Sequence, residues 1–243
     1  MIINLFTATS IRIANKDPVH VAPSQYTEID KTLARLLGGW RALTVEQYRY
    51  LNEQTGIFPG RTRIPELIKR GFIVRHELLD GNNKRICGYY VTGPVAAKLC
   101  GLPAPPELDL TLTVSVLMCN QLIISGLVAR WDVRRIFDLG VGRVPCWITR
   151  LGQSYGVLPL FGHPHAVVTT LSRARRGLLI VPDTDAAISF AKVAPIPVRY
   201  LLWSDLLNWQ ILIYKVEDGE LIPATISFSN NVQSPVYTAH GRQ

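Results

Sequence analysis

The stretch RIPELIKRGFIVRHELLDGNNKRICGYYVTG, residues 63–93, decides how the first half of this chain folds. It opens with apolar residues at the spacing of one helical face, and Gly71 follows as a residue suited to end a helix. Residues 72–79 change to a strand-like pattern, residues 80–83 are typical of a tight turn, and residues 84–91 return as a second strand. The stretch therefore predicts a short helix followed by a β-hairpin.

Two further helices are predicted upstream of this stretch. Residues 26–37 place apolar side chains at helical spacing, with Thr27 as the cap and Gly38-Gly39 as the stop. The sequence Thr44-Val-Glu-Gln47 is a capping box, and the helix that it opens ends near Thr55-Gly56. The residues of the first helix that we expect to face the core are Ile29, Leu33, Leu36 and Leu37.

The ends of the third helix and the segment after the hairpin complete the pattern. We expect Thr62 to cap the third helix, with Pro65 in the first turn, where its missing N–H is not needed. A closing helix follows from Thr92 to Leu99 and ends at Gly101. Three helices followed by a hairpin with a basic tip is the order of a winged helix-turn-helix.

Basic residues are concentrated in the same half of the chain. Residues 1–102 hold 14 Lys or Arg and 8 Asp or Glu, whereas residues 103–243 hold 12 and 10. The window 61–85 alone carries seven basic and three acidic residues. Such a patch attracts a polyanion, and its coincidence with the third helix and the hairpin favours double-stranded DNA as the partner.

Each part of the pattern has an expected place on DNA. The third helix would enter the major groove with Arg63 near base edges, the hairpin tip would place Lys84 near phosphates, and the second helix would face the backbone through its N-terminus. A winged helix that binds only protein is the alternative. The predicted DNA-contacting residues are Thr44, Arg61, Thr62, Arg63, Glu66, Lys69, Arg70, Arg75, Asn82, Asn83, Lys84 and Arg85.

Roughly residues 27–101 resemble the replication-relaxation family. The segments that carry the resemblance are IDKTLARLL (29–37), LTVEQ (43–47), LIKRGFI (67–73), GYYVTG (88–93) and LCG (99–101). The resemblance implies a winged-helix protein of plasmids and other mobile elements, linked to plasmid replication and DNA relaxation. It also implies a second domain with a restriction-endonuclease-like fold.

The proline-rich residues 103–106 (PAPP) are the predicted domain boundary, because three prolines in four residues favour an extended connector. Residues 1–102 would form the DNA-binding domain and residues 103–243 a small α/β domain. Residues 110–129 are 20 positions without a charge, long enough to span a bilayer. The amides of Asn120-Gln121 in their middle favour a buried helix and no membrane segment.

The rest of the second half indicates an α/β arrangement, so the whole chain is expected to be α+β or α/β. Residues 178–181 form an expected strand, residues 185–192 a helix and residues 198–202 a second strand, which is typical of a parallel pair. Shorter helices are expected at residues 166–174 and from Ser204 to Leu207. For the tail, pairing of residues 225–228 as an edge strand stays open against a mobile tail.

No catalytic or metal-binding pattern is apparent in the sequence. Asp138 is followed by no Glu-x-Lys, and Asp183 lies where a turn or a helix cap explains it. The pair Gly162-His-Pro-His165 has only Cys146 nearby in sequence. The four cysteines show no C-x-x-C spacing, which indicates neither a disulfide framework nor a zinc knuckle. We therefore expect no enzyme, no cofactor and no metal.

The sequence as a whole predicts a cytoplasmic, sequence-selective DNA-binding protein of a mobile element. It would be a non-catalytic accessory in plasmid replication, mobilisation or its regulation, with replication or mobilisation proteins as further partners. A homodimer would form through residues 103–243, where Trp131, Trp147, Trp203 and Trp209 lie. The alternatives are a phage or plasmid transcriptional repressor, a metal-dependent nuclease of restriction-endonuclease-like fold, and a protein-binding scaffold.

Overall fold

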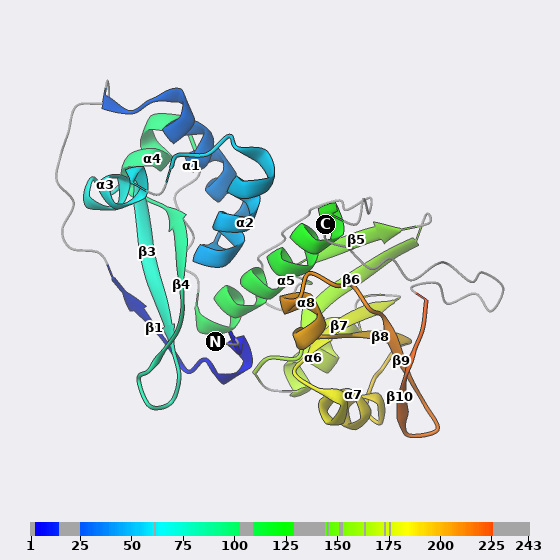
Figure 1. Ribbon diagram of the computed structural model, residues 1–243. Coiled ribbons are helices and arrows are strands. Elements are labelled where there is room, and N and C mark those ends of the chain that lie inside the picture. The colour runs from blue at the N-terminus through cyan, green and yellow to red at the C-terminus, as the bar shows by residue number, and fades with distance from the viewer. Residues whose placement is uncertain are drawn as a thin grey trace. The chain divides into compact units, whose positions relative to one another are not determined.

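The chain divides into two compact units, Ile3–Leu117 and Met118–Gln243, each with helices and one β-sheet (Figure 1). The computed structural model describes residues 3–14, 25–60, 62–102, 109–128, 144, 146–150, 153–162, 164–172, 174 and 176–225. The division between the units falls inside helix α5 (Leu110–Val128). The prolines of residues 103–106, where the sequence placed a boundary, lie outside the described residues. The fold is mixed α+β, and we describe each unit by itself.

The first unit has the helices and the hairpin in the order that the sequence predicts. Its sheet is antiparallel, with the strand order β1-β3-β4-β2. Its helices are the 3-10 helix η1 (Leu5–Thr7), α1 (Glu28–Trp40), α2 (Val45–Thr55), α3 (Arg63–Lys69) and α4 (Pro94–Cys100). Its strands are β1 (Ser10–Ile13), β2 (Leu43–Thr44), β3 (Ile73–Leu79) and β4 (Arg85–Thr92).

Local capping signals in the first unit are confirmed. The Thr27 hydroxyl accepts a hydrogen bond from the backbone N–H of Asp30 at 3.2 Å, and the Thr44 hydroxyl accepts one from Gln47 at 3.0 Å. Gly71 ends α3 with φ of 66°, a backbone conformation that side chains disfavour. These contacts are made within a few residues of chain, so the sequence alone suffices to predict them.

Three expectations for the first unit are wrong. Helix α1 does not stop at Gly38-Gly39 but continues to Trp40, because that side chain is buried and the Leu102 side chain packs against Gly38, 3.2 Å from where a Cβ would stand. Ile29 is 53% exposed, since Asp30 takes the inward position beside it. Thr62 precedes α3 but makes no side-chain capping hydrogen bond, because its backbone is already helical.

The second unit is built on a six-stranded mixed sheet with the order β10-β9-β8-β7-β6-β5. The central strands β6, β7 and β8 run parallel, which confirms the predicted parallel pair, and the outer pairs are antiparallel. Its strands are β5 (Cys146–Arg150), β6 (Gln153–Pro159), β7 (Gly177–Val181), β8 (Val198–Leu202), β9 (Tyr214–Glu217) and β10 (Glu220–Pro223). Its further helices are α6 (Pro164–Leu171), α7 (Thr184–Ala191) and α8 (Trp203–Leu207).

The core of the second unit lies where α6 and α7 pack on the parallel strands. Leu171 from α6 and Phe190 from α7 belong to one buried cluster with Leu179 and Val181 from β7 and with Tyr200 from β8. Alternate residues of a strand face one side of a sheet, so these β7 residues present the same face to both helices. Among the described residues of this unit, no charged side chain is fully buried.

The amides of the long apolar helix α5 are buried, as expected from the sequence. Asn120 is 0% and Gln121 is 5% exposed. The Gln121 side chain donates a hydrogen bond to the Leu206 carbonyl at 2.9 Å, which offsets the cost of burying the amide. Among the described residues, no helix combines the length and the apolar character that crossing a membrane requires.

Two details of the second unit differ from the sequence-based expectation. Helix α6 ends at Leu171, short of residue 174, and α8 begins at Trp203, whose buried side chain anchors the helix without a side-chain cap. Beyond residue 225 the tail lies outside the described residues, so an edge strand at residues 225–228 stays a prediction. The strand that does form at the sheet edge is β10.

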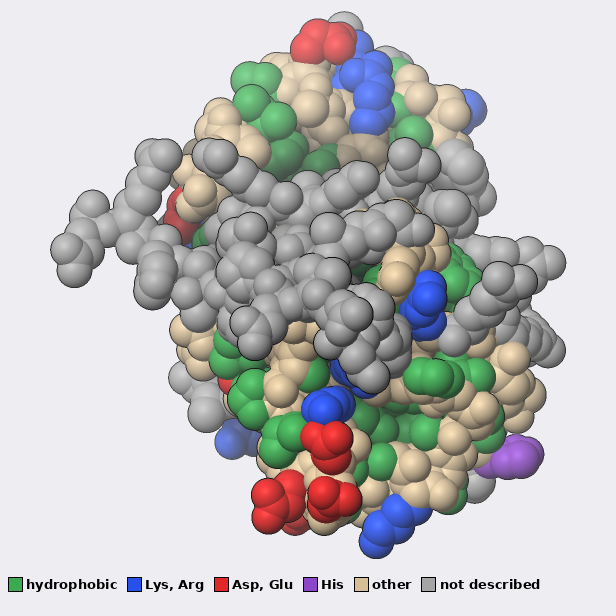
Figure 2. All heavy atoms as spheres, turned by 90° about the vertical axis from the view of Figure 1, so that its right-hand side faces the viewer, with side chains coloured by type: hydrophobic (Ala, Val, Ile, Leu, Met, Phe, Trp, Pro, Cys, Tyr) green, Lys and Arg blue, Asp and Glu red, His purple; other side chains and the backbone are tan. Residues whose placement is uncertain are grey.

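The surface of the second unit is not basic at its sheet edge. The turn between β9 and β10 exposes Glu217, Asp218 and Glu220. Figure 2 shows acidic side chains gathered toward the lower edge of the face that it presents, with basic side chains lying singly between hydrophobic ones. This arrangement is unlike the first unit, whose basic side chains are grouped.

Candidate nucleic-acid interface

The tip of the β3–β4 hairpin presents polar and basic side chains to solvent. Asn82, Asn83 and Lys84 are exposed, and Asn83 adopts φ of 59°. The Asp80 carboxylate accepts hydrogen bonds from the backbone N–H groups of Asn82 and Lys84, both at 2.9 Å, and so fixes the turn. The tip is therefore a rigid loop that carries a lysine and two amides.

Arg63 is held by a structural ion pair at the start of α3. Its guanidinium lies 2.7 Å from the Asp30 carboxylate, whose side chain is 1% exposed, and it also donates to the Gln25 carbonyl at 3.0 Å. Burial raises the pKa of Asp30, but the hydrogen bonds from Arg63 and from the Thr27 backbone outweigh it and hold that pKa below its ordinary value. The expectation that Arg63 points outward is wrong, because a buried carboxylate requires a cationic partner.

The other predicted DNA-contacting residues of α2 and α3 differ in their pairing and in their exposure to solvent. Arg70 pairs with Glu66 at 2.7 Å and its side chain is only 15% exposed. Thr44 is buried as the cap of α2, whereas Thr62 and Lys69 are exposed. Arg61 lies outside the described residues. Lys69 is thus the predicted basic residue of α3 that is exposed to solvent.

Three arginines gather around one glutamate on the sheet of the first unit, a group that we call the arginine cluster: Arg12, Arg75, Arg85 and Glu77. The Glu77 carboxylate lies 2.5 Å from Arg12, 3.6 Å from Arg85 and 3.7 Å from Arg75. The hydrogen bond from Arg12, with the charges of Arg85 and Arg75, holds the pKa of Glu77 below its ordinary value against the effect of burial. The cluster has a surplus of two positive charges, and the three arginine side chains are 32–57% exposed.

Gly88 on β4 makes room for two of these arginines. A Cβ at Gly88 would stand 3.2 Å from Nη2 of Arg85 and 3.4 Å from Nε of Arg75. A side chain at this position would therefore press on both guanidinium groups and shift them.

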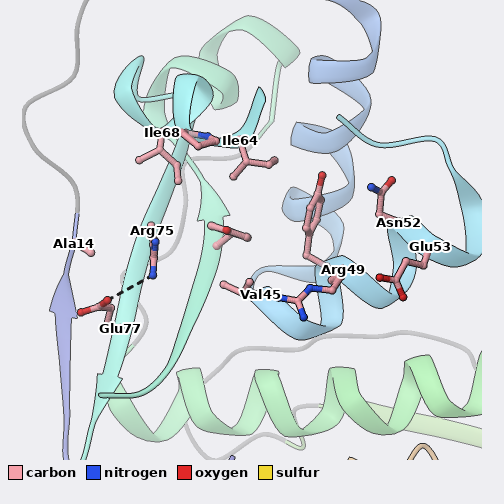
Figure 3. Close-up of a pocket in the computed structure, with 12 residues that line it drawn as sticks. Ala14, Val45, Arg49, Asn52, Glu53, Ile64, Ile68, Arg75 and Glu77 are labelled. Atoms are coloured by element: carbon pink, nitrogen blue, oxygen red, sulfur yellow. Dashed lines mark ion pairs between the residues drawn. The ribbon is translucent and has the colours of Figure 1, made fainter. Parts of the chain in front are cut away.

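A groove of about 650 Å³ adjoins the arginine cluster (Figure 3). Strands β3 and β4 contribute Arg75, Glu77 and Tyr90, and Ala14 follows β1; Figure 3 shows α3 above these strands and α2 to their right. The residues that α2 and α3 contribute are Val45, Tyr48, Arg49, Asn52, Glu53, Ile64, Pro65 and Ile68. Cationic, acidic, aromatic and aliphatic side chains thus line one groove.

The sequence patterns did not indicate that Arg12, Arg49 and the two tyrosines of the groove, Tyr48 and Tyr90, belong to this site. Arg12 is brought to Glu77 by the pairing of β1 with β3, across 65 residues of chain. Arg49 lies on the exposed face of a short helix, where a single arginine carries no signal of its own. The period-two alternation of SIRI, residues 10–13, is the signal that could have revealed β1.

The candidate residues of the second unit that the structure describes form no group able to hold a metal ion. The Asp183 carboxylate accepts a hydrogen bond from the backbone N–H of Ala186 at 2.8 Å, which confirms the helix-cap interpretation. Asp138 and His163 lie outside the described residues, and His165 is exposed whereas Cys146 is buried. Within the described ranges, no three His, Cys, Asp or Glu side chains form a group able to hold a metal ion.

The tryptophans expected on a homodimer surface are distributed between core and surface. Trp203 is buried, Trp147 and Trp209 are half-buried, and Trp131 lies outside the described residues. Trp203 therefore contributes to the core of the second unit. The homodimer itself stays a prediction.

Comparisons with known proteins identify no relative of this chain. No family model matches it, and neither the curated proteins nor the solved structures contain a match. The similarity of residues 27–101 to the replication-relaxation family therefore stays a prediction that rests on the residues quoted above.

Proposed function

We propose that the first unit binds double-stranded DNA as a winged helix, with α3 as the recognition helix and the β3–β4 hairpin as the wing. The observation that carries this proposal is the arginine cluster, a surplus of two exposed positive charges on the sheet beside α3. Grouped cations create a local positive potential that attracts the phosphate backbone, whereas scattered cations create no such local potential. Lys69 on α3 and Lys84 at the tip would extend the contact on either side.

The second unit has a supporting role in this proposal. Its described residues include no group of three His, Cys, Asp or Glu side chains able to hold the metal ion that metal-dependent hydrolysis requires. The family resemblance favours a non-catalytic accessory in plasmid replication or mobilisation, and a repressor would use the same DNA-binding step. A degenerate restriction-endonuclease-like fold for this unit belongs to the same proposal.

The test is the salt dependence of binding to a duplex, measured by fluorescence anisotropy on the full chain. About five to seven phosphate contacts correspond to a log–log slope of roughly −5 to −6. Lys69→Ala and Lys84→Ala are each expected to reduce that slope by about 1. Lys98→Ala on α4, also exposed, is the matched control and leaves the slope unchanged. A flat salt response, or equal effects of all three variants, contradicts the proposal.

A further inference from the structure

We propose that the groove of the first unit binds a nucleotide unit, a phosphate joined to a base that carries an exocyclic amino group. Its source would be a free nucleoside monophosphate or an unpaired nucleotide of a DNA strand. The inference rests on the groove itself and not on duplex binding. A volume of about 650 Å³ lies within the range of roughly 300–1,000 Å³ that small-molecule sites occupy.

The phosphate would lie at the end of the groove where the arginines meet. Arg49 from α2 and Arg75 from β3 both line it, and Arg12 and Arg85 stand next to Arg75 around Glu77. Burial raises the pKa of Tyr90 and Glu46 adds to that increase, whereas Arg75, Arg85 and Arg49 act to lower it, so three cations and one carboxylate lie near this tyrosine. Since the cluster already neutralises Glu77, the field at this end is positive, and guanidinium forks match phosphate oxygens.

The base would lie along α2, toward its C-terminal end. Asn52 and Glu53 follow Arg49 by about one helical turn, roughly 5–6 Å, which is comparable to the step from a phosphate to its base. The Asn52 side-chain oxygen accepts a hydrogen bond from the Phe58 backbone at 3.2 Å, so its NH₂ group is the part able to donate to a ring nitrogen. The Glu53 carboxylate would accept from the exocyclic amino group. This donor and acceptor order fits adenine and cytosine and mismatches uracil and thymine.

The flat faces of the base have an apolar wall to contact. Ile64, Pro65 and Ile68 of α3 line the groove. Tyr48 is held in place because its hydroxyl donates to the Pro59 carbonyl at 2.6 Å and its ring meets Tyr90 edge-on at 5.8 Å. A wall already fixed in this way loses little side-chain freedom when a planar ring packs on it.

Calorimetry on the full chain at low salt tests this site, with AMP, CMP, UMP, adenosine and inorganic phosphate as probes. We expect AMP and CMP to bind, and UMP, adenosine and phosphate each to bind at least about tenfold more weakly, since each lacks one set of contacts. Arg49→Gln should weaken AMP binding by about tenfold or more. Arg35→Gln, at an arginine on α1 that is also exposed but lies outside the groove, should leave AMP binding unchanged. Glu53→Gln should narrow the preference for AMP over UMP.

Two further experiments identify the source of the bound nucleotide and the role of the arginine cluster. If single-stranded oligo(dA) binds and AMP does not, with the same loss in Arg49→Gln, the occupant is a nucleotide within a strand and the site stands. Gly88→Ala should weaken binding because a Cβ displaces the guanidinium groups of Arg85 and Arg75. Circular dichroism verifies that each variant folds.

The outcomes that overturn the site are distinct from those that concern duplex binding. The site is refuted if neither AMP nor oligo(dA) binds, if adenosine binds as tightly as AMP, or if a folded Arg49→Gln behaves as the wild type does. Lys69→Ala and Lys84→Ala report on the duplex contact and are expected to leave AMP binding unchanged. Loss of duplex binding with AMP binding retained would therefore remove the proposed function and keep this site.

Discussion

The two units place their charged side chains in opposite ways. In the first unit, carboxylates are drawn inward and matched by arginines, as Asp30 is by Arg63 and Glu77 is by the arginine cluster. In the second unit, the sheet packs an uncharged core, and the ion pair of Lys215 with Glu217 lies on the surface of β9. Both units have apolar cores, but among the described residues only the first unit also buries charged side chains, Asp30 and Glu77.

This difference bears on function as well as on stability. Arginines that pair with buried carboxylates are fixed in position, so they present their remaining N–H donors in a set geometry. A surface pair such as Lys215 with Glu217 stabilises little and fixes little. The unit with inward carboxylates is thus the one prepared to recognise an anionic ligand.

The largest expected effect comes from breaking the inward pair of the first unit. Arg63→Ala leaves the Asp30 carboxylate buried without its cation, which should lower the free energy of unfolding by about 3–5 kcal/mol. Urea denaturation of the full chain measures the loss. Lys31→Ala, which removes the exposed pair with Glu28, is the control and should change stability little. An Arg63→Ala variant as stable as Lys31→Ala would mean that the pair is not structural.

The expected loss of stability in Arg63→Ala also affects how the role of Arg63 in DNA binding can be tested. The sequence suggests testing it by loss of discrimination between DNA sites. Because Arg63 supports α1 from α3, an alanine there lowers affinity through folding even if the residue touches no base. Lys69 and Lys84 are the cleaner probes of DNA contact, since both are exposed.

A change of pH should alter the contribution to stability of one carboxylate in each unit, in opposite directions. The folded pKa of Asp30 is lowered, so its stabilisation is present above the unfolded pKa of about 3.9 and is lost as pH falls through the folded value. Burial raises the pKa of Asp205, which the Tyr214 hydroxyl only partly offsets, so its contribution is favourable in acid and is lost as pH rises through the folded pKa. Lowering the pH should therefore destabilise the first unit through Asp30. In the second unit it should remove the cost of burying the ionised Asp205.

Hydrogen exchange read by mass spectrometry, corrected for intrinsic rates, resolves the two units in the full chain. Asp30→Asn should flatten the acid dependence of the first unit. Asp205→Asn should protect the second unit more strongly at neutral pH, because an amide avoids the cost of burying a charge. If Asp205→Asn instead loosens the second unit at neutral pH, the hydrogen bond from Tyr214 outweighs that burial cost and the contrast fails.

Sequence patterns predicted those parts of both units that arise within a short stretch of chain. The cap at Thr27, the capping box at Thr44, the hairpin turn and the strand–helix–strand unit around α7 are set by neighbouring residues. The Asp30–Arg63 pair joins residues 33 apart and the Arg12–Glu77 pair residues 65 apart. No local pattern contains such a partner, because only the packed sheet and helices bring it close.

The failure at Gly38-Gly39 has the same origin. Two glycines cost a helix about 2 kcal/mol relative to alanine, and locally they read as a stop. Burial of Trp40 and the contact of Leu102 at Gly38 offset that cost from outside the helix. The candidate site was likewise predictable only in part. The basic residues of the hairpin could be predicted from the sequence, whereas the groove forms only when α2, α3 and β1 have packed together.

The smallest expected effect concerns the cap of α7 in the second unit. Asp183→Ala removes the acceptor for the Ala186 N–H and should lower stability by about 1 kcal/mol. Asp185→Ala, in the first turn but without the capping role, should cost less through its weaker effect on the helix dipole. Thermal denaturation of the full chain compares the two variants.

Asparagine at the same position separates a cap from a metal ligand. Asn caps helices as well as Asp does, so Asp183→Asn should retain the stability that Asp183→Ala loses. A Mg²⁺ site would behave differently, because a neutral amide is a much poorer ligand for a hard dication than a carboxylate. We expect wild-type protein and Asp183→Asn alike to leave supercoiled plasmid uncut in Mg²⁺ or Mn²⁺. Nicking by the wild type that disappears in the equally stable Asp183→Asn would show that this carboxylate serves catalysis, and that the second unit is more than an apolar support.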